Sequence, residues 1–193
     1  MFEVETRHPL DYFGTVIVIN LQSRPDRKIE MEAEFHKIGY STSKVVWFEA
    51  VRPQDKGAFE SIGARGCFMS HLSVLKSASL RKSNRLLILE DDCSFVPDFV
   101  SRLHSLVHHL GTRDWDMLYG GGVPDRPQPA VNGLSEIPAD CGILTTHSVA
   151  FNGYAIEKTL AYIERQLFRP VGHPDGAPSM SMVLTAGPGA NSD

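Results

Sequence analysis

Short apolar runs alternate along the chain with longer segments in which apolar residues recur every three or four positions. Runs of this kind predict buried strands, at residues 15–21, 44–51, 85–90, 115–120 and 145–152. The helical period is clearest over residues 97–110, and further helices are predicted after Ser23, after the small residues 63–66 and from Ile156. This alternation predicts an α/β fold: a single domain with a mostly parallel sheet and helices on both faces.

The domain boundaries follow from the same pattern. The 193 residues are enough for one domain, which we place at residues 15–176. Residues 1–14 are expected to be an N-terminal extension, and the small, polar residues 177–193 a short tail, disordered or truncated. Residues 122–142 are rich in proline and glycine and predict a long loop, functional or mobile.

Composition narrows the class of protein. The chain has 19 basic and 23 acidic residues, a net charge of −4, which argues against a nucleic-acid binder. Its three cysteines form no Cys-x-x-Cys pair, which argues against a zinc site built on them and favours a reducing compartment. No apolar run is long enough to span a bilayer and the N-terminus lacks a basic leader. We therefore expect a cytoplasmic protein with at most peripheral contact with the inner membrane face.

The sharpest chemical feature is the run of Glu90, Asp91 and Asp92 directly after a predicted buried strand. Three neighbouring carboxylates repel one another and are costly to desolvate. A hard cation such as Mg²⁺ or Mn²⁺ among them would offset that cost, because it prefers oxygen ligands. The alternative is a solvated acidic turn that caps the next helix. In open α/β sheets ligands bind outside the carboxyl ends of the strands, which favours the metal hypothesis.

Polar residues also follow the first predicted strand, where neither a Gly-x-Gly-x-x-Gly nor a Walker loop is present. Asn20 at the strand tip can hydrogen-bond a base or ribose. Arg24 and Arg27 near a helix N-terminus can meet phosphate oxygens. Without a glycine cradle, a metal would be needed to neutralise bound phosphates. The alternative is that both arginines lie on a solvated helix face.

Two further segments carry candidate residues. Gly66 and Ser70 are small residues that allow the backbone to approach a ligand closely, and His71 borders the apolar stripe of the same predicted helix. A buried histidine and a ligand-contacting one are equally compatible with that position, and Cys67 is expected to be a small core residue. The last helix is followed by His173 and Asp175 in a Pro/Gly turn, which can supply a metal ligand and a base, or be an ordinary turn.

Taken together, these motifs resemble glycosyltransferase family 25, which includes bacterial lipooligosaccharide galactosyltransferases and collagen galactosyltransferases. The resemblance extends over residues 15–176 and rests on the order of four motifs. They are Val-Ile-Asn-Leu at 18–21 with Arg24 and Arg27, Gly-Cys-x-x-Ser-His at 66–71, Leu-Ile-Leu-Glu-Asp-Asp at 87–92, and Asp-Trp-Asp at 114–116 with Tyr-Gly at 119–120.

The resemblance implies a GT-A-like fold, a UDP-sugar donor, commonly UDP-galactose, and Mn²⁺ or Mg²⁺ as the cofactor. It further implies inversion at the anomeric carbon and a glycan or glycolipid acceptor, as in lipopolysaccharide or surface polysaccharide synthesis. The resemblance implies that Glu90, Asp91 and Asp92 form the metal-binding and donor-binding motif, with Asp92 as the direct ligand. It also implies a donor side at Asn20, Arg24 and Arg27, a site-lining helix with Gly66, Ser70 and His71, and an acceptor-side acid at Asp175. His173, in the turn after the last helix, is a further candidate metal ligand.

The leading hypothesis is therefore a metal-dependent inverting hexosyltransferase. Its base is Asp175, with His173 or His71 as alternatives, and the cation on Asp91 and Asp92, assisted by Arg24, would stabilise the leaving diphosphate. One rival is a non-catalytic nucleotide-sugar or glycan-binding relative with an incomplete acceptor site. A magnesium-dependent phosphohydrolase is the other, although the chain lacks an obvious second carboxylate cluster.

Overall fold

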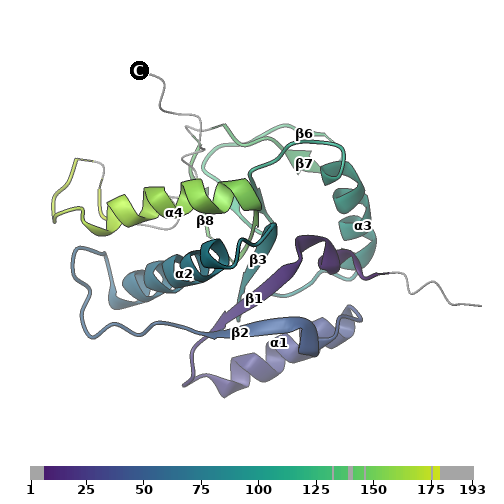
Figure 1. Ribbon diagram of the computed structural model, residues 1–193, viewed down its shortest axis with the longest axis horizontal. Helices are drawn as coiled ribbons and strands as arrows, with labels where there is room; N and C mark the ends of the chain where they lie inside the picture. The colour runs from purple at the N-terminus through teal and green to yellow at the C-terminus, as the bar shows by residue number, and fades with distance from the viewer. Residues whose placement is uncertain (1–6, 132, 139–140, 146, 175, 179–193) are drawn as a thin grey trace, which may run out of the picture.

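The computed structural model describes residues 7–131, 133–138, 141–145, 147–174 and 176–178. Its elements in chain order are η1 (Pro9–Phe13), β1 (Thr15–Asn20), α1 (Pro25–Lys37), η2 (Thr42–Lys44), β2 (Val45–Glu49), α2 (Ile62–Leu80), β3 (Arg85–Glu90), α3 (Phe99–Leu110), β4 (Met117–Tyr119), β5 (Val123–Pro124), β6 (Ala130–Val131), β7 (Leu134–Ser135), β8 (Ile143–Leu144), β9 (Ser148–Asn152) and α4 (Gly153–Leu167). Figure 1 shows helices on both sides of a central sheet.

The central sheet has five strands in the order β2-β1-β3-β9-β4. Strand β1 runs parallel to both β2 and β3, whereas β9 runs antiparallel to β3 and to β4. Four strands therefore share one direction and β9 is the reversed member. The predicted α/β class, with a mostly parallel sheet in a single domain, is confirmed and is compatible with a GT-A-like fold.

Both faces of the sheet are covered because the strands are apolar on both sides. In β1, Ile17 and Ile19 face the core under α2 and α4, while Val16 and Val18 face the core under η1, α1 and α3. Successive residues of a strand point to opposite faces, so a continuous apolar run serves two cores. All four side chains are at most 7% exposed. This two-sided burial confirms the prediction of helices on both faces.

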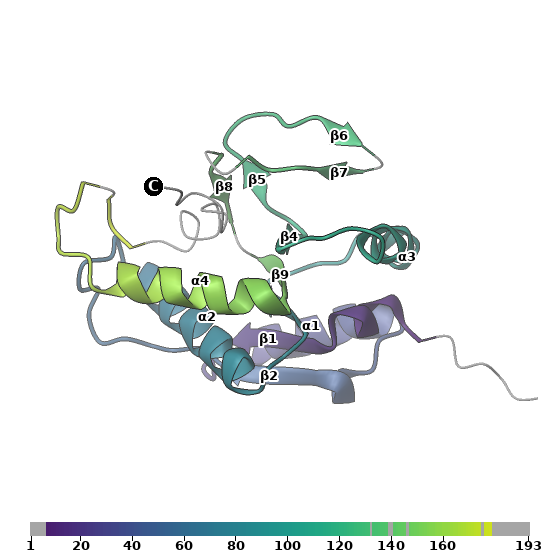
Figure 2. The same ribbon diagram turned by 45° about the horizontal axis from the view of Figure 1, so that its top comes forward.

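Several boundaries differ from the sequence prediction. Helix α2 begins at Ile62, since the Ser61 side chain accepts the backbone N–H of Ala64, and residues 63–66 lie inside the helix rather than before it. The segment 122–142, predicted as a loop, contains β5, β6 and β7. These strands form two small antiparallel pairs, β5 with β8 and β6 with β7, which rise from the central sheet in Figure 2.

The predicted N-terminal extension contributes to the core. Residues 9–13 form η1, and its Leu10 and Phe13 are buried against the cluster that includes Val16 and Leu87. The described part of residues 1–14 therefore packs on the domain that was predicted to begin at residue 15. None of the described helices is long and apolar enough to cross a membrane.

A matched pair of leucines tests the assignment of the core. Leu86 in β3 is fully buried, whereas Leu80 at the end of α2 is 85% exposed. We expect Leu86→Ala to lower the free energy of unfolding by about 2–5 kcal/mol, because it leaves a cavity. Leu80→Ala should change it by about 0.5 kcal/mol or less. Urea denaturation measures both values, and equal effects would contradict the sheet and helix packing described above.

Candidate functional site

The carboxyl ends of the parallel strands β1, β2 and β3 meet at one edge of the sheet and open into a cavity of about 400 Å³. Arg24 follows β1, Val51 follows β2 and Glu90 ends β3; all three line the cavity, as do residues of the first half of α2. This is the edge at which open α/β sheets bind ligands. A second cavity, of about 520 Å³, lies near Asn84 and Gly153 at the opposite end of β3, away from the acidic run.

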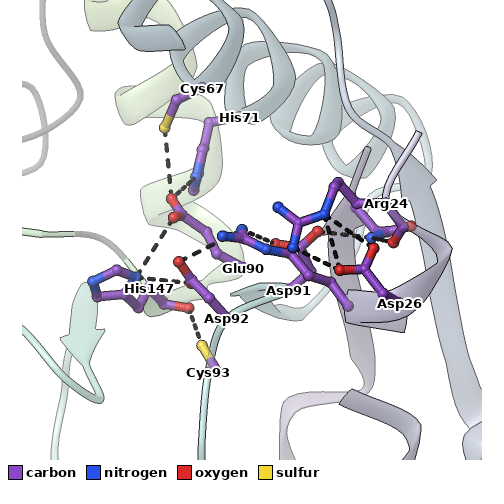
Figure 3. Close-up of polar contacts among 11 residues, drawn as sticks. Arg24, Asp26, Cys67, His71, Glu90, Asp91, Asp92, Cys93 and His147 are labelled. Atoms are coloured by element: carbon purple, nitrogen blue, oxygen red, sulfur yellow. Dashed lines mark hydrogen bonds and ion pairs between the residues drawn. The ribbon is translucent and has the colours of Figure 1, made fainter. Parts of the chain in front are cut away.

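Glu90 occupies the centre of the site. Its Oε1 lies 3.4 Å from His71 Nε2 and accepts a hydrogen bond of 3.5 Å from the Cys67 thiol. Its Oε2 lies 3.6 Å from His147 Nδ1. Figure 3 shows His71 and Cys67 on one side of the Glu90 carboxyl and His147 on the other. The two oxygens of Glu90 therefore face two different sets of side chains.

Asp91 is held from the side of β1 and α1. Its Oδ2 accepts a 2.7 Å hydrogen bond from Asn20 Nδ2, and its Oδ1 accepts a 2.9 Å bond from Arg27. The residue is only 8% exposed, so these charge-assisted bonds offset the cost of burying its carboxylate. Asp91 thus fastens β3 to α1 and to the end of β1.

Asp92 points to the other side and meets His147. Its Oδ1 lies 3.1 Å from His147 Nδ1, and its Oδ2 lies 3.8 Å from Arg27. The side chain of Asp92 is 40% exposed, in contrast to the nearly buried Asp91. Glu90, Asp92 and His147 each offer a ligand atom, and these three atoms lie within 4.8 Å of one another. Two carboxylates and an imidazole suit Mn²⁺ or Mg²⁺ in their chemistry.

Several interactions act on the ionisation of Glu90. Burial favours the neutral carboxyl, and the hydrogen bond from His71 opposes it. The pKa of Glu90 is also lowered by positive charge on His71 and His147 and by the hydrogen bond from Cys67. The pKa of Glu90 consequently lies below its ordinary value, which keeps the carboxylate charged beside the cavity.

Gly66 and Ser70 shape the cavity wall. A Cβ on Gly66 would lie 2.8 Å from the backbone oxygen of Val51, so only glycine lets the segment after β2 approach α2 this closely. The Ser70 hydroxyl accepts the N–H of Val51 at 2.8 Å and donates to the Gly66 carbonyl at 2.7 Å. Both residues were predicted as donor-binding; in the structure they join α2 to residue 51 at the cavity.

The arginines near the first strand differ in their partners. Arg24 lines the cavity, and its guanidinium binds both oxygens of the Asp26 carboxylate. The hydrogen bond that Arg24 donates to the Asp26 carboxylate raises the pKa of Arg24, and burial opposes that shift only in part. Arg27 bonds Asp91, as described above. Asn20, predicted to bind a base or ribose, directs its Nδ2 to Asp91 and to the Arg24 carbonyl.

The remaining predicted residues are placed as follows. His71 is fully buried and contacts Glu90, which makes it a buried histidine next to the site. His173 follows α4 in a turn, where its N–H bonds the Pro170 carbonyl, and it belongs to neither of the metal-capable groups among the described residues. Asp175 lies outside the described residues.

Sequence reasoning missed two residues. His147 precedes β9, and only the pairing of β9 with β3 brings it to Glu90: its carbonyl oxygen accepts the Glu90 N–H at 2.8 Å. Cys67, predicted as a core residue, packs partly buried against the core cluster, and it also lines the cavity, which the sequence did not show. The Cys67–His71 spacing of four residues on a helix was the available signal for a shared face.

Comparisons with known proteins converge on one family. Residues 49–122 match the family model described as "Glycosyltransferase family 25 (LPS biosynthesis protein)". The chain is 30% identical over 148 residues to "Procollagen galactosyltransferase 1-A" of Xenopus laevis, an alignment that covers 63% of this chain and 24% of that protein. These matches confirm the predicted resemblance to glycosyltransferase family 25.

Two further relatives differ in what their names state. "Inactive glycosyltransferase 25 family member 3" of Homo sapiens is 32% identical over 145 residues, 63% of this chain and 24% of that protein. "Procollagen lysyl hydroxylase and glycosyltransferase" of Acanthamoeba polyphaga mimivirus is 33% identical over 130 residues, 53% of this chain and 14% of that protein. The chain spans about a quarter or less of the length of these relatives.

Two glycines of α2 test how the cavity wall is built. Gly66→Ala would place a methyl group against the Val51 carbonyl, and we expect it to lower the free energy of unfolding by about 1–3 kcal/mol. Gly63→Ala meets only the Ser61 hydroxyl at an ordinary 3.7 Å, and should raise that free energy by about 0.5–1 kcal/mol. Urea denaturation measures both, and a stabilising Gly66→Ala would contradict the close approach.

The lowered pKa of Glu90 predicts how stability depends on pH. A carboxyl with a lowered pKa stabilises the fold above its ordinary value of 4.5, and this contribution is lost as the pH falls through the folded-state value. We therefore expect Glu90→Gln to flatten the loss of unfolding free energy below pH 4.5. Glu30→Gln is the matched control, since it removes one exposed carboxylate and leaves the Glu90 contacts in place. Unfolding free energies are measured by urea denaturation at each pH. If they fall with pH at the same rate in both variants, the Glu90 contacts are rejected.

Proposed function

From the relationship to glycosyltransferase family 25 and the geometry of the site, we propose that this chain carries the donor-binding and metal-binding part of a glycosyltransferase. It would move a hexose, galactose by preference, from a UDP-sugar to a hydroxyl of a glycan or glycolipid acceptor. Inversion at the anomeric carbon and a setting in lipopolysaccharide or surface polysaccharide synthesis belong to the same proposal. The words "LPS biosynthesis" in the family description and "galactosyltransferase" in a relative's name support it.

One observation carries the proposal: Glu90, Asp92 and His147 offer three converging ligand atoms beside a cavity at the carboxyl ends of three parallel strands. The donor set fits Mn²⁺ or Mg²⁺, and a cation there would supply positive charge that stabilises a leaving diphosphate. We propose Glu90, Asp92 and His147 as its holders, and revise Asp91 from a ligand to an anchor, because Asn20 and Arg27 already bond both of its oxygens.

The other residues would bind and orient the donor. Arg24 lines the cavity, binds Asp26 and interacts electrostatically with Asp91. Its guanidinium is therefore suited to bind a phosphate oxygen in place of Asp26 or together with it. The segment from Val51, fixed by Ser70, forms a wall on which a nucleoside can lie. His71 is reassigned from base to positioning residue, because it is fully buried and hydrogen-bonded to Glu90.

The acceptor side rests on the sequence prediction. Asp175 remains our proposed base, which would take the proton from the acceptor hydroxyl during attack on the anomeric carbon. The alternative function is a non-catalytic nucleotide-sugar or glycan-binding protein. A specific observation favours that alternative, since a relative of similar identity is named inactive. Both functions include binding of the donor, but only the transferase releases UDP from it.

A pair of aspartates separates these functions and tests the metal site. We expect Asp92→Asn to lower Mn²⁺-dependent release of UDP from UDP-galactose by about 10²–10³-fold, because the cation loses a charged ligand. Asp98 lies exposed at the start of α3, where it pairs with Arg102, and Asp98→Asn should retain the wild-type rate. Circular dichroism of both variants controls for folding.

Undiminished UDP release by Asp92→Asn would reject the metal assignment. Calorimetric binding of UDP-galactose with no UDP release by the wild-type protein would reject the transferase and support the binding protein. Inorganic phosphate as the product would instead indicate a phosphohydrolase.

A further inference from the structure

A second set of metal-ligand side chains lies on the cavity side of Glu90. Cys67 and His71 are one turn apart on the same face of α2, and both approach Glu90 Oε1, the oxygen that faces away from His147. Cys67 Sγ, His71 Nε2 and a Glu90 oxygen lie within 4.8 Å of one another. All three residues line the cavity. This set differs from the Glu90–Asp92–His147 set in containing a thiol.

The distances within the set match those around a tetrahedral zinc ion. Zinc bonds of about 2.3 Å to sulfur and about 2.0–2.1 Å to nitrogen and oxygen place tetrahedral ligand atoms about 3.5 Å (S to O) and about 3.3 Å (N to O) apart. The structure has 3.5 Å from Cys67 Sγ to Glu90 Oε1 and 3.4 Å from His71 Nε2 to the same oxygen. Two edges of the required tetrahedron are therefore present before any ion binds.

We propose that Cys67, His71 and Glu90 form a Zn²⁺ site whose fourth position opens to the cavity. On binding, the Cys67 thiol and His71 Nε2 each release a proton to solvent. The thiolate and the neutral imidazole then bond the ion, and no electron is transferred. One thiolate, one carboxylate and one neutral imidazole balance the charge of Zn²⁺, which lowers the cost of holding the ion in a partly buried place. The soft sulfur ligand selects zinc over Mg²⁺ or Mn²⁺.

The ion held there is expected to be exchangeable. A histidine that binds a metal through Nε2 usually donates its other ring nitrogen to an acceptor, and losing that bond weakens affinity by about 10–100-fold. His71 Nδ1 is buried without a hydrogen-bond partner among the described residues. Zinc at this place would occupy the cavity wall and take one oxygen of Glu90. Zinc inhibition of donor turnover would follow; that consequence rests on the proposed function, whereas zinc binding does not.

Cobalt provides the direct test, because Co²⁺ substitutes for zinc and shows a thiolate-to-metal absorption band only when sulfur is a ligand. We expect the purified wild-type protein to bind one equivalent of Co²⁺ with this band and Zn²⁺ to remove it. Cys67→Ser should abolish the band and weaken zinc binding at least about tenfold. Cys93→Ser is the matched control: the Cys93 thiol bonds the His147 carbonyl and is not part of the Cys67–His71–Glu90 set, so this variant should keep the band.

A measurement on the wild-type protein avoids dependence on the variant's folding. Zinc should slow alkylation of Cys67 by iodoacetamide at least about tenfold, as read by peptide mass spectrometry, and leave Cys93 unaffected. Absence of the cobalt band, its survival in Cys67→Ser, or unprotected Cys67 would overturn the site. A cobalt band in a protein that releases no UDP would reject the proposed function and keep the zinc site. UDP release by a protein without the band would reject the zinc site and keep the proposed function.

Discussion

Mutual repulsion among three consecutive carboxylates at the end of β3 is the constraint around which the site is organised. Each carboxylate turns to a different neighbour: Glu90 to His71 on α2, Asp91 to Arg27 on α1, and Asp92 to His147 before β9. Partners on separate elements draw those elements together at one point of the sheet edge. Glu90 and Asp91 line the cavity, so their paired charges contribute to the electrostatics of the space that a ligand would enter.

The reversed strand β9 makes this arrangement possible. A parallel strand beside β3 would bring its carboxyl end to the site, whereas antiparallel β9 brings its first residues. His147 therefore contributes twice, with a carbonyl oxygen that accepts the Glu90 N–H and a ring that faces Asp92. The Cys93 thiol bonds the same carbonyl at 2.7 Å, which further fixes residue 147. A mixed sheet thus supplies a ligand that a fully parallel one would place at the opposite edge.

The sequence was sufficient to predict the layers of the fold, and it named Glu90 and Asp92 as candidate residues of the site. Apolar runs predict β1 and β3 well because their two faces are both buried, and the acidic run is found because three carboxylates after such a strand need an explanation. His147 could not be predicted in the same way, since its role depends on the direction of β9, and periodicity carries no information about strand direction. Gly66 lines the cavity, but its contact with Val51 depends on how a loop packs on a helix, which the sequence does not show. Cys67 packs against the core as predicted, but its position in the cavity wall could not be predicted from the sequence.

The shortness of β4 affects how the protein meets other molecules. The outermost strands of the sheet are β2 and β4, and β4 has only three residues. An exposed edge offers unpaired backbone groups to a strand of another molecule, and three residues provide too few of them for stable pairing. On that side the sheet is therefore protected against edge-to-edge aggregation by its own geometry, with no need for a charged or proline-capped border.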